Sequence, residues 1–398
     1  MAQKKKRAPA KKAPAKKVAK PTLRFATPFT AAPPIAQRVA GPYGTRLVDH
    51  TKGTLFKIPP ASPANSIMPL SQVIGQQAAN AIAATGQIQF HAAGDTGKGP
   101  DTAQTLVADA MTTDYNLQNP DKSPAFFFHL GDVTYGHDKV QLFRRQFYEP
   151  YVHYPGKIIG IPGNHDGETF PSSDPVSLKA FMANFCASSQ AVPPIAGSIF
   201  RQTMDQPGVY WLLDAPFVQI VGLYSNAAEN PGFIRGQIPT EVQYNWLVTT
   251  LRAIKTARDQ GSNKKKLIMA THHPPYTSGG HSPSTEMLAD LDSACTQAGI
   301  MPDLFLSGHA HSYQRYTRRL PFAGKQLAIP YIVAGTGGIN DQAIVAASGQ
   351  VTGQATFEKS MKGYGYLLIT VNASKISGTF YAVDPSTGQK TQYDQFTA

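Results

Sequence analysis

Residues 125–135 read AFFFHLGDVTY, an apolar run that stops at a glycine and a carboxylate. A short, continuous apolar run closed by a Gly-containing turn is typical of a strand buried on both faces of a sheet. Four other stretches repeat this pattern: QIQFHAAGD (87–95), KIIGIPGNHD (157–166), KLIMATHHPP (266–275) and DLFLSGHAH (303–311). Each run therefore predicts a strand that ends in polar side chains suited to binding metal.

The segments between these strands have helical character. The predicted helices span 138–148, 177–185, 241–259 and 285–298. A hairpin is predicted at 208–224, and the alternating residues 364–381 predict two closing strands. The alternation of strand, loop and helix predicts an α/β (α+β) fold built as a sandwich of sheets and helices.

The positive charge of the chain is concentrated at its start. Residues 1–24 contain ten Lys and Arg and no acid, so subtracting them from the formal charge of +12 leaves +2 for the remainder. This Lys/Ala/Pro-rich tail cannot bury apolar area and is expected to be disordered. It is either a solubilising tail or a weak contact for nucleic acid or another polyanion. Residues 25–84 are expected to pack as an extension on a catalytic domain spanning 85–398.

The side chains at the strand ends are of the kinds that bind divalent or trivalent first-row metals. They comprise carboxylates, an amide oxygen and imidazoles. No cysteine is among them, which argues against a structural zinc site. The two cysteines, Cys186 and Cys295, are expected to be free thiols, with a single disulfide as the alternative. Each motif alone is a common turn, but all five together, at the carboxyl ends of strands, predict one shared metal site.

The motifs GDxG, GDxxY, GNHD, HHPP and GHxH in this order resemble the calcineurin-like metallophosphoesterases and, within them, the purple acid phosphatases. Most members of that superfamily have a His where this chain has Gly97, and they lack Tyr135. GHAHSYQR (308–315), Gln243 to Leu247 and the glycine-rich run 335–338 agree with the narrower resemblance. The resemblance covers about 87–382. It implies the two-sheet sandwich flanked by helices that is typical of this fold.

The resemblance also implies a set of ligands for two metal ions. The first ion, ferric in the family, would be held by Asp95, Asp132, Tyr135 and His311. The second, which is Fe, Zn or Mn in the family, would be held by Asp132, Asn164, His272 and His309. Asp132 would bridge the two ions. The family pattern selects His272 and leaves His273 as its neighbour.

Two further histidines receive catalytic roles from the resemblance. His165 would face the phosphate rather than a metal ion. His281 lies on the Gly-rich loop TSGGHSPS and would donate a proton to the leaving group. An exposed loop histidine is the alternative for His281. By contrast, His91 and His129 lie within apolar strands and are expected to be hydrogen-bonded core residues.

The implied function is a binuclear-metal phosphomonoesterase of the acid phosphatase type. It would hydrolyse small phosphate esters by attack of a metal-bound hydroxide. Two alternatives remain: a phosphodiesterase of the same superfamily, and a polyanion-binding protein with a vestigial phosphatase body. We expect no membrane span, because no apolar run reaches eighteen residues. A cytoplasmic location is expected, because no signal peptide is recognisable, although the family is commonly secreted.

Overall fold

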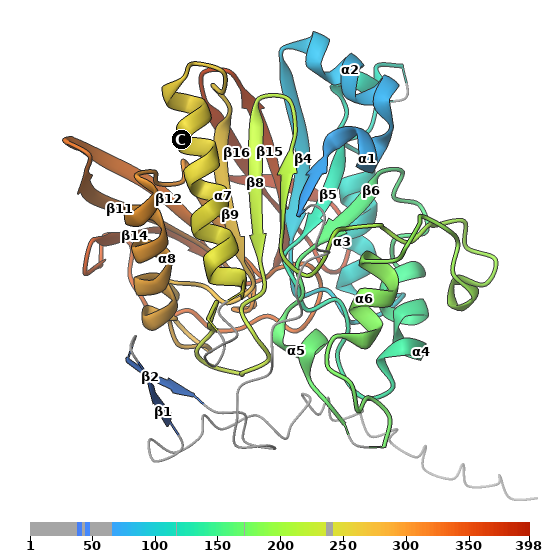
Figure 1. The fold of residues 1–398 in the computed structure, drawn as a ribbon. Coiled ribbons are helices and arrows are strands. Elements are labelled where there is room, and N and C mark those ends of the chain that lie inside the picture. The colour runs from blue at the N-terminus through green and yellow to red at the C-terminus, as the bar shows by residue number, and fades with distance from the viewer. Residues whose placement is uncertain (1–37, 42–43, 48–65, 117, 171, 236–241) are drawn as a thin grey trace, which may run out of the picture.

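A computed structural model describes residues 38–41, 44–47, 66–116, 118–170, 172–235 and 242–398. Two sheets pack face to face, and helices cover their outer sides (Figure 1). This architecture confirms the predicted fold class. The basic tail lies outside the described residues, and the division of the chain at 24 and 84 stays a prediction.

The larger sheet has nine strands in the order β13-β14-β11-β12-β10-β9-β8-β7-β3. Its central strands β12, β10, β9 and β8 run parallel, so their carboxyl ends meet at one edge. The strands are β3 (Ile67–Pro69), β7 (Trp211–Asp214), β8 (Val218–Leu223), β9 (Lys266–Thr271), β10 (Leu304–Ser307), β11 (Tyr313–Phe322), β12 (Lys325–Ala334), β13 (Val351–Thr352) and β14 (Ala355–Met361).

The smaller sheet has six strands in the order β17-β16-β15-β4-β5-β6. Its strands β4, β5 and β6 are parallel. The strands are β4 (Gln87–Ala93), β5 (Phe126–His129), β6 (Lys157–Gly160), β15 (Tyr364–Asn372), β16 (Ile376–Val383) and β17 (Lys390–Thr397). A separate hairpin pairs β1 (Arg38–Gly41) with β2 (Gly44–Leu47).

The four predicted helices are present, with ends shifted by a few residues. No helix in the described part of the chain is long and apolar enough to cross a membrane. The α-helices are α1 (Leu70–Ile74), α2 (Gln76–Thr85), α3 (Ala103–Thr112), α4 (Lys139–Phe143), α5 (Asn164–Gly167), α6 (Lys179–Phe185), α7 (Val242–Asp259) and α8 (Thr285–Ala298). A π-helix, η3 (Arg144–Tyr148), continues α4, and short 3-10 helices form η2 (Pro120–Lys122) and η4 (Pro194–Ala196).

Helix α3 is the element that the sequence analysis missed. Its start carries a recognisable signal, because the Thr102 side chain accepts a hydrogen bond from the backbone N–H of Gln104. Its buried residues Val107, Ala108 and Met111 also recur at helical spacing. The strands β11 and β14 were likewise not predicted, since polar residues interrupt their apolar pattern. Strand β12 was also missed, although its residues 327–334 (LAIPYIVA) are continuously apolar.

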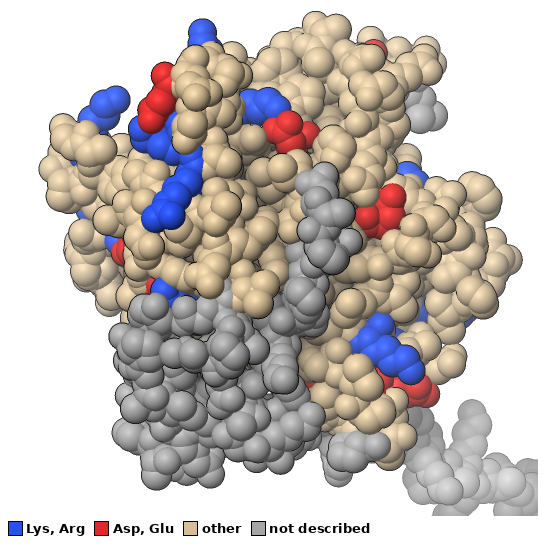
Figure 2. All heavy atoms as spheres, viewed as in Figure 1, with Lys and Arg blue, Asp and Glu red and all other residues tan. Residues whose placement is uncertain are grey.

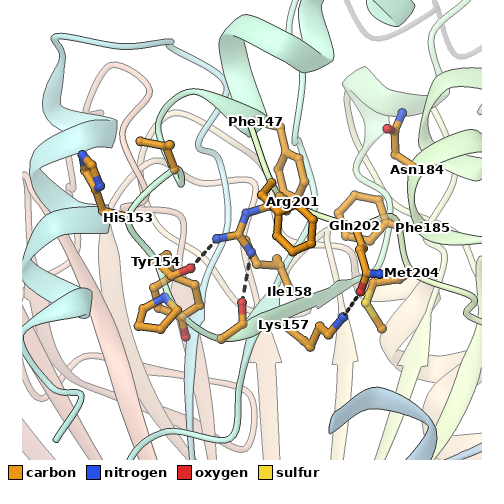
Figure 3. A pocket seen from close by; sticks show the side chains of 14 residues that line it. Phe147, His153, Tyr154, Lys157, Ile158, Asn184, Phe185, Arg201, Gln202 and Met204 are labelled. Atoms are coloured by element: carbon orange, nitrogen blue, oxygen red, sulfur yellow. Dashed lines mark hydrogen bonds between the residues drawn. The ribbon is translucent and has the colours of Figure 1, made fainter. Parts of the chain in front are cut away.

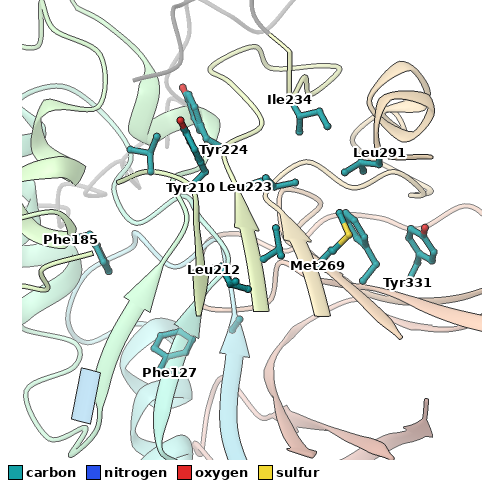
Figure 4. Close-up of a cluster of buried hydrophobic side chains, with 14 of the residues drawn as sticks. Phe127, Phe185, Tyr210, Leu212, Leu223, Tyr224, Ile234, Met269, Leu291 and Tyr331 are labelled. Atoms are coloured by element: carbon teal, nitrogen blue, oxygen red, sulfur yellow. The ribbon is translucent and has the colours of Figure 1, made fainter. Parts of the chain in front are cut away.

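The central strands are apolar on both faces because each face meets a different core. Phe126 and Phe128 of β5 point into the core between the two sheets, whereas Phe127 points into the outer core beneath the helices. The outer core brings Phe127 of the smaller sheet together with side chains of the larger sheet and of the helices α6 and α8 (Figure 4). This double burial explains the continuous apolar runs, since alternation is expected only where one face meets water.

Charged side chains on the surface are sparse outside the N-terminal tail. On the face in Figure 2 they are scattered, and both signs are present. This agrees with the charge of +2 that the sequence leaves once the ten tail charges are removed. Free thiols at Cys186 and Cys295 confirm the expectation for the cysteines.

A polar network is buried at the outer side of the smaller sheet. His91 of β4 lies 2.9 Å from the Tyr154 hydroxyl and 3.1 Å from the Asp114 carboxylate. Tyr366 and Lys390 each donate to the same carboxylate at 2.6 Å. His129 is likewise bonded, to Thr96 Oγ1 at 2.9 Å. Both histidines are therefore satisfied core residues, as predicted.

Asp114 should contribute to stability through its charge. Burial raises the pKa of Asp114, but hydrogen bonds from His91, Lys390 and Tyr366 outweigh burial and lower the pKa. We predict that Asp114→Asn lowers the free energy of unfolding by ~2 kcal/mol near pH 7, because a hydrogen bond to a charged group contributes ~1.5–3 kcal/mol. The folded-state pKa lies below the unfolded value of ~3.9, so the loss should be complete above about pH 4.

Urea unfolding between pH 7 and pH 3 measures this effect. The difference between wild type and variant should shrink as the pH falls through the folded-state pKa of Asp114, where the wild type also becomes neutral. The exposed Asp121 offers a matched control, and Asp121→Asn should cost little at any pH. A difference that stays constant into acid would contradict the prediction.

Candidate metal centre

The five strand ends meet at one edge of the sandwich. Strands β4, β5 and β6 of the smaller sheet deliver Asp95, Asp132 and Asn164, and β9 and β10 of the larger sheet deliver the three histidines of the predicted ligand set. Backbone hydrogen bonds join the two sheets here: Gly94 N–H donates to Ala334 O, and Gly337 N–H donates to Gly94 O, both at 2.9 Å. The site therefore spans both sheets.

All nine predicted site residues lie together. Asn164 Oδ1 is 3.1 Å from His272 Nε2 and 3.0 Å from His309 Nδ1. His272 Nε2 is also 3.3 Å from Asp132 Oδ2. Ligand atoms of Asp132, His272 and His309 all lie within 4.8 Å of one another, which is the spacing of a metal site. The full set comprises Asp95, Asp132, Tyr135, Asn164, His165, His272, His281, His309 and His311.

The hydrogen bonds of the histidines fix which ring nitrogen carries the proton. His272 Nδ1 lies 2.8 Å from Leu130 O, and His311 Nδ1 lies 2.8 Å from Asn340 O. A carbonyl only accepts, so in each neutral ring Nδ1 is the donor and the lone pair is on Nε2. The Nε2 atoms of the two rings face oxygens of Asp132, Asn164 and Asp95. Burial lowers the pKa of His272, but Asp132 and Asp95 outweigh burial and raise it to about 9.

Buried carboxylates that face one another need a compensating positive charge, which a protonated imidazole or a metal ion supplies. Asp132 Oδ2 is buried and has no hydrogen-bond partner among the described residues. A buried carboxylate oxygen left in this state costs free energy unless a positive charge compensates it. Carboxylate oxygens, an amide oxygen and imidazole nitrogens are also the donor set expected for first-row metals. The residues present therefore fit the predicted metal ions.

The electrostatics of the two carboxylates support the same conclusion. Burial raises the pKa of Asp95 to about 7 against the opposing effect of His272, and Asp132 raises it further. Burial also disfavours the charge on Asp132, but His272 and His165 outweigh burial and lower its pKa. Two carboxylates this close ionise together only beside a compensating positive charge.

Tyr135 extends the cluster on the side of Asp95. Its hydroxyl lies 3.2 Å from Asp95 Oδ1 and 3.5 Å from His311 Nε2. Its ring passes beside Gly97, where an added Cβ would lie only 2.6 Å from Tyr135 Cδ2. Gly97, the position that holds a His in most of the superfamily, thus makes room for the tyrosine ring.

The backbone is strained at three of the proposed ligands. Asp95, Asp132 and His309 have φ values of 60°, 54° and 68°, in the left-handed region that residues with a side chain rarely adopt. Gly163 provides the close approach that this geometry needs, because a Cβ there would lie 2.0 Å from Asp132 Oδ1. Such strain persists where surrounding contacts hold the side chains in a functional arrangement.

His165 lies beside the cluster as a buried cation. Its backbone N–H donates to Asp132 Oδ1 at 2.9 Å, and its Nδ1 lies 3.1 Å from Glu168 Oε2. Burial alone would lower the pKa of His165, but Glu168 and Asp132 outweigh burial and raise it to about 10. Glu168 was missed in the sequence. Its position three residues after His165, on the one-turn helix α5, is the signal that could have found it.

His281 packs on the cluster from the other side. Its ring centroid is 3.9 Å from that of His309, so it is not an exposed loop histidine. Its two ring nitrogens lie near amide groups, with Asn230 Nδ2 at 3.2 Å and Gln342 Nε2 at 3.0 Å. The sequence analysis missed both amides and Glu229, whose Oε2 lies 3.2 Å from Asn164 Nδ2.

A signal for this loop was present in the sequence. Strand β8 is followed by Tyr224 and then by the polar residues Ser225, Asn226, Glu229 and Asn230, which repeats the pattern of an apolar strand ending in polar side chains. Ser225 Oγ lies 2.8 Å from His273 Nδ1, and Ala228 O lies 2.7 Å from His273 Nε2. Both ring nitrogens of His273 therefore have partners outside the cluster, whereas Nε2 of His272 faces Asn164 and Asp132 inside it.

Comparison with known proteins agrees with this geometry. Residues 88–313, more than half of the chain, match the family model of the calcineurin-like phosphoesterases. The chain belongs to this family. It is a metal-dependent phosphoric ester hydrolase by family. The cluster of candidate metal ligands lies where the motifs of that family converge.

A curated relative points to a narrower group. Purple acid phosphatase 21 of Arabidopsis thaliana is 24% identical over 292 residues, which cover 71% of this chain and 57% of that protein. The chain thus spans little more than half the length of this relative.

Two solved structures share the fold. GAP50, the anchor in the inner membrane complex of Plasmodium, is 14% identical with a TM-score of 0.51, and the match covers 77% of this chain and 89% of GAP50. PhoD is 11% identical with a TM-score of 0.50, and the match covers 78% of this chain and 69% of PhoD. At these identities the likeness concerns the fold alone.

Proposed function

We propose that this phosphoesterase is a binuclear-metal phosphomonoesterase of the acid phosphatase type. One observation carries the proposal: ring nitrogens of three histidines, two carboxylates and an amide oxygen converge on one buried point. The likeness to purple acid phosphatase 21 favours the acid phosphatase type within the family.

The proposed ligands divide into two groups that share Asp132. One ion, ferric, would be held by Asp95, Asp132, Tyr135 and His311. The other, Fe, Zn or Mn, would be held by Asp132, Asn164, His272 and His309. When bound, such ions supply positive charge for the phosphoryl group and a water of lowered pKa for attack on phosphorus.

The residues of the chain supply the remaining parts of the reaction. His165 is cationic and buried beside the cluster, so it binds an equatorial oxygen of the phosphoryl group and offsets its charge. Glu168 positions His165 through its contact with Nδ1. His281, whose ring nitrogens lie beside the amides of Asn230 and Gln342, would donate a proton to the leaving oxygen in acid, because burial lowers its pKa to about 4.

The bridge is tested by Asp132→Ala. The substitution removes the carboxylate shared by both groups of ligands, so metal content should fall below two ions per chain. Turnover of an aryl phosphate should fall about 10³-fold, a loss in the range measured when one electrostatic contact to the transition state is removed. Metal analysis and steady-state kinetics measure the two effects. Asp109→Ala, on the exposed side of α3, is the matched control.

The same assays separate the alternatives. A wild-type protein that prefers aryl diesters over monoesters would support the phosphodiesterase instead. A wild type without bound metal and without turnover would support the polyanion-binding protein. An Asp132→Ala variant that keeps two ions and nearly normal turnover would exclude the proposed bridging role of Asp132.

Tyr135 should give the oxidised protein a visible colour. A phenolate bound to a ferric ion has a charge-transfer absorption in the visible range, so the oxidised protein should be violet to pink. We predict that Tyr135→Phe bleaches this band while iron remains bound. Absorption spectra recorded with iron analysis measure the effect, and Tyr381→Phe, in β16 away from the cluster, should keep the band. A wild type with full iron content and no band would exclude Tyr135 as a ligand.

His281 should matter most for leaving groups that need a proton. An alkoxide leaves poorly without protonation, whereas a nitrophenolate leaves readily. His281→Ala should therefore slow alkyl phosphate hydrolysis about 10²-fold, the usual contribution of a general acid, and nitrophenyl phosphate hydrolysis much less. Comparing kcat/KM on both substrates measures the difference, with His153→Ala as a control on an exposed loop. Equal losses on both substrates would leave His281 only a role in binding phosphate.

A further inference from the structure

A second cavity lies at the opposite end of strand β6 from the metal centre. Its volume is about 350 Å³. Lys157, the first residue of β6, lines the cavity, whereas the site residue Asn164 lies four residues beyond Gly160, the last residue of the same strand. None of the nine proposed site residues lines it. The cavity is therefore separate from the catalytic centre, and a ligand bound in it is independent of the proposed function.

Two cations line this cavity, and neither has an acidic partner. Arg201 donates to the backbone carbonyls of Gly156 at 3.0 Å, of Tyr151 at 2.6 Å and of Tyr154. Lys157 Nζ donates to the side-chain oxygens of Gln190 at 2.8 Å and Gln202 at 2.7 Å. All these acceptors are neutral. No Asp or Glu lines the cavity, and no described carboxylate forms an ion pair with either cation.

The two positive charges also act on each other. Burial lowers the pKa of Lys157, and the nearby guanidinium of Arg201 lowers it further, while Asp205 opposes these effects. Like charges held close together at a partly desolvated surface repel, and a bound anion relieves the repulsion. The backbone carbonyls hold the Arg201 guanidinium in a fixed orientation among the lining side chains (Figure 3).

The remaining wall is largely aromatic and apolar. Figure 3 shows Phe147, Phe185, Ile158 and Met204 around the Arg201 side chain. Phe200 also lines the cavity, yet 91% of its surface is exposed to solvent. An exposed aromatic side chain at the edge of a cavity gains free energy when it covers an apolar ligand.

We propose that this cavity binds a small organic anion that consists of an aromatic ring bearing one carboxylate. The carboxylate lies between Lys157 and Arg201, where it supplies the charge that the neutral partners lack. The ring lies against the exposed side chains of Val152 and Phe200, because Phe147 and Phe185 are almost fully buried. A volume of about 350 Å³ is in the range of small-molecule sites, which are mostly apolar with a few polar groups placed to fix orientation.

Calorimetric titration of the metal-loaded full-length protein with 2-naphthoate tests the proposal. The titration buffer contains no phosphate or other polyvalent anion, because such an anion would compete for the two cations. The uncharged isostere 2-naphthylmethanol is titrated in parallel and should bind at least tenfold more weakly, since it cannot pair with the two cations. Equal binding of the two compounds would overturn the role of the charge.

Two variants locate the binding. Lys157→Met keeps the apolar stem and should weaken naphthoate binding about tenfold. Phe200→Ser removes an exposed ring, so it should leave the fold intact and weaken binding about fivefold. The matched controls are Lys375→Met and Val345→Ser, exposed positions that do not line the cavity, and both should bind as the wild type does.

Activity distinguishes this cavity from the catalytic centre. Both cavity variants should hydrolyse a small phosphate ester at the wild-type rate, because neither residue contacts the metal cluster. The proposal is overturned if the wild type does not bind 2-naphthoate at millimolar concentration, or if both cavity variants bind it as tightly as the wild type.

Discussion

The pairing of two buried carboxylates, Asp95 and Asp132, is the constraint on which the site depends. Both lie at the carboxyl ends of neighbouring parallel strands of the smaller sheet, and water does not reach them. The larger sheet brings Nε2 of His272 and His311 toward them, while Nδ1 of each ring donates to a backbone carbonyl on the far side. The protein thus builds a cluster that is stable only with positive charge inside it.

The same constraint explains the strained backbone. Asp95, Asp132 and His309 adopt positive φ because their side chains must turn back toward one point from strands that run nearly side by side. Each such residue lowers the free energy of unfolding by ~1–3 kcal/mol. The surrounding hydrogen bonds hold the arrangement in place, and Gly163 leaves room for the Asp132 side chain. His309 N–H donates to Asp95 Oδ2 at 2.7 Å, so one strained turn of the larger sheet is tied to one of the smaller sheet.

The sequence predicted those parts of the molecule in which a local pattern of residues follows from a single physical requirement, such as burial on both faces of a sheet. The five apolar runs are buried on both faces, so they identify central strands, and the polar residues after them are the proposed ligands. Helix α3 and strand β11 were missed, because partly exposed elements mix polar and apolar residues. Glu168, Glu229 and Asn230 were missed for another reason: their role lies in contacts with His165, Asn164 and His281, which only the fold brings together.

Gly97 and Tyr135 show how a change in one loop depends on another. A histidine at position 97 would place its Cβ 2.6 Å from the Tyr135 ring, so the two side chains cannot share the space. In this chain the second loop fills that space with a phenol, whose oxygen lies 3.2 Å from Asp95 Oδ1. The glycine at 97 and the phenol at 135 therefore depend on each other sterically, because a larger residue at 97 would collide with the Tyr135 ring. This coupling makes the pair a more informative sign of the ligand set than either residue alone.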